Sequence, residues 1–139
     1  MWCHGSSGIL LGKLATLPLE DSVDVQEEIR GGLEDLCQAA AKSDAASGGA
    51  DDVCCGRMGH VEALLYAYEK LGEARYLAAA QKLVVRAWHR RRREGRYKLT
   101  AARGTDLFSP SLFQGLAGVG YTCLRLAMPR ELPCLALLE

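Results

Sequence analysis

The sequence predicts an all-α fold built of helical hairpins, and three observations support this class. A short glycine motif occurs three times, and each copy precedes an apolar run with helical spacing. Longer, charged segments with a single apolar stripe separate the copies. No stretch of alternating polar and apolar residues is long enough to predict a sheet. The chain has 139 residues, 49% of them hydrophobic, which suits one compact unit with a core.

The glycine motif has the form G-x-x-G. Its copies begin at Gly5, Gly56 and Gly115, at intervals of roughly 50 to 60 residues. Self-similarity of this kind is typical of stacked supersecondary units. We expect the three glycine-led helices to lie on the inside of the fold, because the missing side chains allow close approach of the backbones.

The elements can be justified in chain order. The first, third and fifth helices follow the three glycine motifs, and Pro129 ends the fifth. The second and fourth helices are amphipathic and should lie outside, with one face in water. Residues 43–53 and about 94–112 have loop composition, with a possible extended piece at 96–100. The apolar stripes are Val25, Ile29, Leu33, Leu36 and Ala40 in the second helix and Leu77, Val84 and Trp88 in the fourth.

Composition argues against several classes of partner. Lys+Arg and Asp+Glu both number 17, so the balanced charge predicts binding neither to nucleic acid nor to an anionic membrane. The longest charge-free run, 107–124, contains a proline and three glycines, and we do not interpret it as a membrane span. The first residues lack the features of a signal peptide.

The six cysteines are better explained by a reduced protein than by a disulfide framework. The pattern is helical, and the adjacent pair Cys54-Cys55 has poor geometry for a bond to itself. We therefore expect a cytoplasmic location. In that setting, clustered cysteines more often bind metal or take part in chemistry.

The glycine repeat places cysteines at matching positions. Cys3 aligns with Cys54, while His4 aligns with Cys55. Equivalent positions in stacked hairpins are neighbours, so Cys3 should meet the Cys54-Cys55 pair at two helix N-termini, which stabilise thiolates. Three thiolates suit Zn²⁺ and leave one open position, which is the pattern of catalytic zinc. The third unit carries Phe113-Gln114 there and is not expected to bind metal.

Other residues have competing interpretations. Buried structural cysteine is the commonest fate of any cysteine, and it is favoured for Cys37, Cys123 and Cys134. His4 is a candidate metal ligand or acid/base, and equally a polar neighbour of Cys3. His60 and His89 are expected to be structural or solvated. The basic run 89–93 is interpreted as a solvated helix end, where cations complement the helix dipole.

Taken together, these motifs resemble the LanC-like family, in particular the cyclase domain of class II, bifunctional lanthionine synthetases. The resemblance implies an α/α toroid of inner and outer helices with zinc at one mouth. It also implies lanthionine formation, in which a cysteine thiol of a dehydrated precursor peptide adds to dehydroalanine or dehydrobutyrine. The residues that carry it are Trp2-Cys3-His4-Gly5, Cys54-Cys55-Gly56, Pro110 to Tyr121, Leu124 to Pro129, and Leu132-Pro133.

The resemblance also implies roles for individual residues. Cys3 matches the first zinc ligand of the family and Cys54 the second. The usual third ligand is a histidine, and here its position holds Cys55. An all-cysteine set resembles a class II subgroup associated with broad substrate tolerance. His4 matches a position beside the first ligand, which implies a role in proton transfer or thiolate positioning.

The cyclase domain of the family is much longer than this chain. We therefore expect residues 1–139 to be a C-terminal part of such a domain, with about three inner and two outer helices in an incomplete ring that depends on the N-terminal part of the synthetase. Three hypotheses remain. The chain is a cyclase piece, a non-catalytic zinc-binding helical module that binds a peptide or partner, or a helical repeat without metal.

Overall fold

The structure of the protein is a computed structural model that describes residues 1–19, 22–42, 49–100 and 108–138. These residues form five α-helices and one short 3₁₀ helix, and no strand is found among them. The prediction of an all-α fold is therefore confirmed. The elements are α1 (Ser6–Thr16), α2 (Val23–Ala41), α3 (Arg57–Leu71), α4 (Ala74–Glu94), α5 (Leu116–Ala127) and η3 (Leu135–Leu137).

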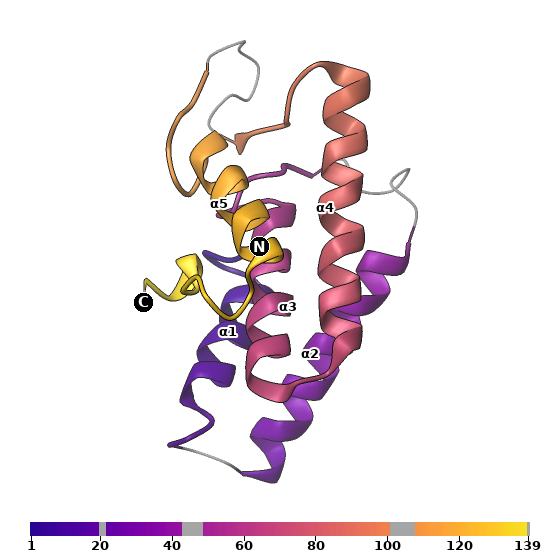
Figure 1. Cartoon of the computed structure of the whole chain (residues 1–139). Coiled ribbons are helices and arrows are strands. Elements are labelled where there is room, and N and C mark those ends of the chain that lie inside the picture. The colour runs from indigo at the N-terminus through magenta and orange to yellow at the C-terminus, as the bar shows by residue number, and fades with distance from the viewer. Residues whose placement is uncertain (20–21, 43–48, 101–107, 139) are drawn as a thin grey trace.

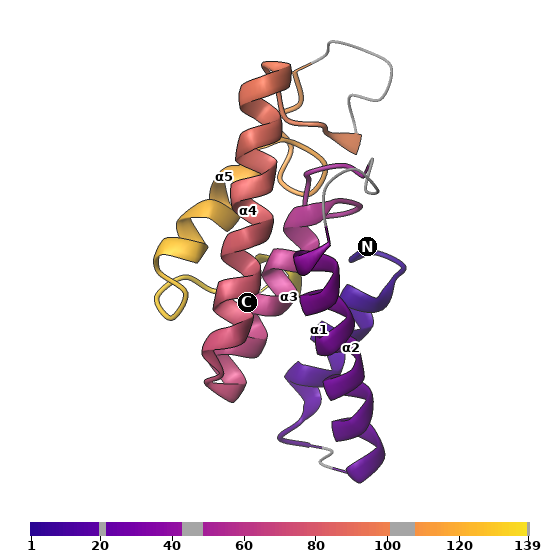
Figure 2. The same cartoon turned by 90° about the vertical axis from the view of Figure 1, so that its right-hand side faces the viewer.

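The helices form two layers (Figures 1 and 2). The glycine-led helices α1, α3 and α5 form one layer with α3 in its middle, while α2 and α4 pack together as the second layer. Each outer helix also packs against the inner helix that precedes it in the chain, α2 against α1 and α4 against α3. The alternation of inner and outer helices agrees with the order predicted from the repeat.

The three glycine motifs have the same backbone conformation. Gly5, Gly56 and Gly115 each occupy the N-cap position of their helix. Their φ/ψ angles are −148°/−177°, −121°/−166° and −135°/−167°, all in the extended region. The sequence repeat is therefore a structural repeat, and the chain enters each of the three helices in the same way.

The second glycine of each motif permits close approach to the preceding loop. A Cβ atom on Gly59 would lie 2.3 Å from the Val53 carbonyl oxygen, and one on Gly118 only 1.8 Å from that of Leu112. Gly8 has the same relation to the Trp2 carbonyl oxygen, at 2.0 Å. The loop before each inner helix thus folds back on the first turn of that helix, and the closest approach at each of these glycines is to its own loop.

The predicted stripe of α2 is confirmed, whereas that of α4 is confirmed only in part, because Leu77 and Val84 are partly buried against the core and Trp88 is not. In α2 the residues of the stripe beyond its first turn, Ile29 to Ala40, are buried. In α4, Trp88 is 48% exposed. Small alanines allow α4 to pack closely on α3, and the larger apolar side chains lie at the edge of the contact. The buried face of α4 is Tyr76, Ala79, Ala80, Leu83, Ala87 and Arg90.

The helix ends follow local signals. Gly72 and Gly95 end α3 and α4 with φ angles of 75° and 74°, in the left-handed region that favours glycine. The last turn of α5 precedes Pro129, as predicted. Of the predicted loop 43–53, residues 43–48 lie outside the described residues. Among the helices that the structure describes, none combines the length and apolar character needed to cross a membrane.

Candidate metal centre

The loop before α3 positions two cysteines by means of a buried carboxylate. Asp52 is fully buried, and its Oδ1 accepts a hydrogen bond from the Cys55 backbone N–H at 2.9 Å. Its Oδ2 accepts another from the Thr100 backbone N–H at 2.6 Å. Because the carboxylate is shared between two segments, it fixes the backbone of Cys55 relative to the chain that follows α4.

Asp51 ties the same loop to the end of α4. Its carboxylate accepts a hydrogen bond from the Lys98 N–H at 2.9 Å and forms an ion pair with Arg90. Arg90 is buried, so the interpretation of the basic run as a solvated helix end is wrong at this residue. The reason is that Arg90 lies on the face of α4 that packs inward. Sequence reasoning missed both acids, although an acidic pair separated from Cys54 only by Val53 was the available signal.

The structure brings the three predicted cysteines together. The sulfur atoms of Cys3, Cys54 and Cys55 all lie within 4.8 Å of one another. The Cys3–Cys55 sulfur distance is 3.7 Å, and the Cys54–Cys55 distance is 3.3 Å. Cys54 is buried, Cys55 is partly buried and Cys3 is exposed, so the cluster opens to solvent at Cys3. His4 Nδ1 lies 2.9 Å from the Cys3 sulfur.

This donor set fits a thiophilic metal ion. A tetrahedral zinc shell with Zn–S bonds of about 2.3 Å separates its sulfurs by about 3.8 Å, close to the distances in the cluster. Burial, reinforced by hydrogen bonds to Cys55 and Cys3, raises the pKa of the Cys54 thiol to about 12. A thiol in this environment keeps its proton near neutral pH unless a cation replaces it. The cluster is therefore suited to a positive ion that compensates three thiolates.

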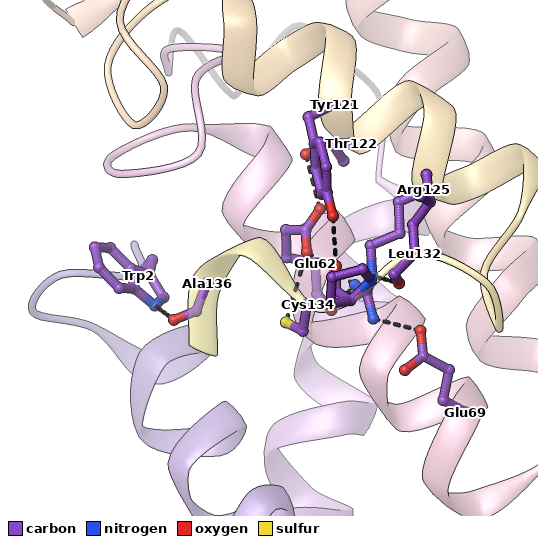
Figure 3. Close-up of polar contacts among 10 residues, drawn as sticks. Trp2, Glu62, Glu69, Tyr121, Thr122, Arg125, Leu132, Cys134 and Ala136 are labelled. Carbon is purple, nitrogen blue, oxygen red and sulfur yellow. Dashed lines mark hydrogen bonds and ion pairs between the residues drawn. The ribbon is translucent and has the colours of Figure 1, made fainter. Parts of the chain in front are cut away.

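Cys3, the exposed ligand candidate, lies in a segment that several contacts of Trp2 hold in place. The Trp2 backbone N–H donates to the Cys54 carbonyl at 3.0 Å, and its indole Nε1 donates to the Ala136 carbonyl at 3.0 Å (Figure 3). The indole also stacks on Phe113, with ring centroids 4.9 Å apart. Trp2, the residue next to Cys3, thus contacts the loop before α3, the loop before α5 and the 3₁₀ helix η3.

A second polar cluster lies between α3 and α5 (Figure 3). Arg125 and Glu62 are fully buried, and their Nη1 and Oε2 atoms are 2.8 Å apart. Thr122 donates to the other carboxylate oxygen of Glu62 at 2.8 Å, and Arg125 also pairs with Glu69. Arg125 Nε donates to the Leu132 carbonyl at 3.2 Å. This Glu62–Arg125 network attaches α5 and the segment after it to α3.

The remaining cysteines lie away from the cluster. Cys134 is fully buried, and its thiol donates to Glu62 Oε2 at 3.6 Å. Burial raises the pKa of this thiol to about 12, and the nearby Glu62 carboxylate acts in the same direction. Cys37 and Cys123 are half-buried on α2 and α5. Cys134 lies in the core and Cys37 packs against it, as predicted.

A comparison of the chain with protein-family models decides its family. The model described as lanthionine synthetase C-like protein matches residues 1–137. The chain belongs to this family. A search of curated proteins gave no match. In this LanC-like chain, the cysteine cluster adjoins a shallow hollow of about 660 Å³ lined by Trp2, Cys3, His4, Gly5, Gly8 and Ile9.

Proposed function

We propose that this LanC-like chain provides the zinc centre of a lanthionine cyclase, with Cys3, Cys54 and Cys55 as ligands. The convergence of the three sulfurs within 4.8 Å at the N-terminal ends of two neighbouring helices carries the proposal. The proposed substrate is a dehydrated precursor peptide, whose cysteine thiol adds to dehydroalanine or dehydrobutyrine. This places the chemistry in a reduced, cytoplasmic setting.

The residues of the cluster suit this addition. Bound zinc would lower the pKa of a peptide thiol enough to make it a thiolate near neutral pH. With three cysteine ligands, one position of a tetrahedral shell is left for the peptide sulfur. The peptide sulfur bonds to the β-carbon of the dehydro residue, and the proton finally reaches the α-carbon. The reaction is thus an addition with no change in redox state.

His4 is the proposed proton carrier. It lies in the hollow beside Cys3 and is exposed, so a peptide thiol that enters can reach its ring. An imidazole there can accept the thiol proton and return it to the α-carbon. Ile9, 64% exposed in the wall of the hollow, offers an apolar contact for the peptide.

Cys55 is proposed to make the centre more reactive than the usual histidine would. Three thiolates donate more negative charge to the metal than two thiolates and an imidazole. A substrate thiolate bound there would then be held less tightly and would be more nucleophilic. In a full-length synthetase, Cys55→His should lower the cyclisation rate. Equal rates for the variant and the wild type would count against this role.

Zinc content tests the proposal directly. We expect elemental analysis to find about one zinc ion per chain in the wild type and none above background in Cys3→Ala. Cys37→Ala is the matched control, since Cys37 is a half-buried cysteine on α2, outside the cluster. It should keep its zinc. A wild-type chain that binds no zinc would overturn the proposal and leave a helical repeat without metal.

A second candidate function is a zinc-binding module without catalysis. Apolar side chains exposed on α5, Leu116 and Leu124, favour it, because they offer a surface for a peptide or protein partner. A dehydrated precursor peptide discriminates between the two candidates. A cyclase removes free thiols from the peptide, in the presence of the N-terminal part of a synthetase if the ring must be completed. A binding module retains the peptide without loss of thiols.

A further inference from the structure

The third glycine-led unit has no cysteine, yet it reaches the cysteine cluster. Gln114 stands directly before Gly115, just as Cys55 stands directly before Gly56. The two glycines have similar backbone angles, so the residue before each of them leaves its loop in the same direction. The repeat therefore carries Gln114 to a position equivalent to that of a proposed ligand.

A contact joins this glutamine to the buried sulfur. Gln114 Nε2 donates to Cys54 Sγ at a distance of 3.8 Å. The neighbouring backbone supports the contact, because the Cys54 N–H donates to the Phe113 carbonyl at 2.8 Å. A Cβ atom on Gly118 would lie 2.9 Å from Val53 Cγ2, which shows how closely α5 approaches the cysteine loop. Two segments in direct contact thus present the amide to the sulfur.

The hydrogen bond from Gln114 should be stronger when Cys54 is a thiolate than when it is a neutral thiol. A thiolate is a much stronger hydrogen-bond acceptor than a neutral thiol. Cys54 is the most buried of the three cysteines, with 8% exposure, so water solvates its charge least. A neutral amide supplies a donor there without adding a positive charge that would compete with a metal ion.

We propose that Gln114 is a positioning residue of the metal centre, which orients the Cys54 sulfur and stabilises it as a metal-bound thiolate. This inference rests on the proposed zinc function. It assigns a role to the third unit, which the sequence predicted not to bind metal. The first two units supply sulfur ligands, and the third supplies a hydrogen bond to one of them.

Metal binding to Gln114→Leu tests the inference in the full chain. Zinc affinity is measured by competition with a chromophoric chelator. We expect binding to weaken about tenfold, as is typical when a hydrogen-bond partner of a metal ligand is lost. Co²⁺ in place of zinc gives a second readout, the sulfur-to-metal charge-transfer absorption. Loss of the donor raises the energy of the sulfur lone pairs, so this band should move to longer wavelength.

The controls separate this inference from the function on which it rests. Gln81→Leu makes the same chemical change at an exposed residue of α4 and should alter neither readout. Gln114→Asn, whose shorter amide falls back from the sulfur, should shift the band in the same direction and serves if the leucine variant folds poorly. Wild-type affinity and an unshifted band in both Gln114 variants would overturn the inference alone. A wild-type chain that binds neither metal would overturn the proposed function and the inference with it.

Discussion

The molecule contains two polar clusters that differ in the pairing of their side chains and in their exposure to solvent. In the Glu62–Arg125 network, charges of opposite sign are paired with each other and sealed from water. In the cysteine cluster, three donors of the same kind face one another, and one edge is open to solvent. A closed set of complementary partners stabilises a fold. A set of like ligand atoms close to one point is suited to bind a metal ion there, as proposed above.

The two clusters also differ in what holds them. The charged network depends on its own side chains, which link α3, α5 and the segment after α5. The cysteine cluster depends on the backbone of three loops and on buried carboxylates behind them. Variants should therefore separate stability from metal binding, and the following predictions run from the largest expected effect to the smallest.

Arg125→Met should lower the free energy of unfolding by about 3–5 kcal/mol, because it leaves the Glu62 carboxylate buried without its partner. Urea unfolding followed by circular dichroism measures the loss. Adding Glu62→Gln to the same chain should recover part of it, since the uncompensated charge is then removed. Stability within about 1 kcal/mol of wild type would show that the network does not hold α5 in place.

Two glycines of α5 provide a matched pair. Gly118→Ala should lower the free energy of unfolding by about 1–3 kcal/mol, because its Cβ would overlap the Leu112 carbonyl. Gly120 meets nothing within 4 Å, so Gly120→Ala should raise stability by about 0.5–1 kcal/mol. Only the first variant should also weaken zinc binding, since it displaces the loop that contacts Cys54. Equal effects of both variants would contradict this close approach.

Zinc affinity should increase with pH. Burial raises the pKa of the Cys54 thiol to about 12, so the thiol is protonated in the metal-free chain and loses its proton when metal binds. Acid favours the protonated, metal-free state, and affinity should rise about tenfold per pH unit for each proton released. Chelator competition in buffers from about pH 6 to about pH 8 measures the slope. A flat profile would show that thiols are not the donors.

Trp2→Phe should have the smallest destabilising effect. Phenylalanine keeps an aromatic ring against Phe113 but loses the indole N–H that donates to Ala136, at a cost of about 1 kcal/mol in stability. Zinc affinity should fall modestly, because the loop that carries Cys3 is less firmly held. Trp88→Phe, at an exposed position on α4, is the control and should change neither quantity.

More of the fold than of the candidate site could be predicted from the sequence. The three glycine motifs and the stripe of α2 were sufficient to predict the hairpins, because helical periodicity and close approach at glycine are local properties. The inward face of α4 was predicted only in part, since Leu77 and Val84 pack against the core from its edge, while smaller alanines lie at its centre. Arg90 was assigned to solvent because a basic run at a helix C-terminus complements the helix dipole, and its partner Asp51 was not identified.

What the sequence alone determined is the order of inner and outer helices and the alignment of Cys3 with Cys54 at two helix N-termini. The tertiary structure decided that the sulfurs approach within 4.8 Å, that buried carboxylates stand behind them, and that Gln114 contacts Cys54. The physical reason is the range of the forces involved. Helix formation depends on neighbours along the chain, whereas pairing of buried polar groups depends on which segments packing brings together.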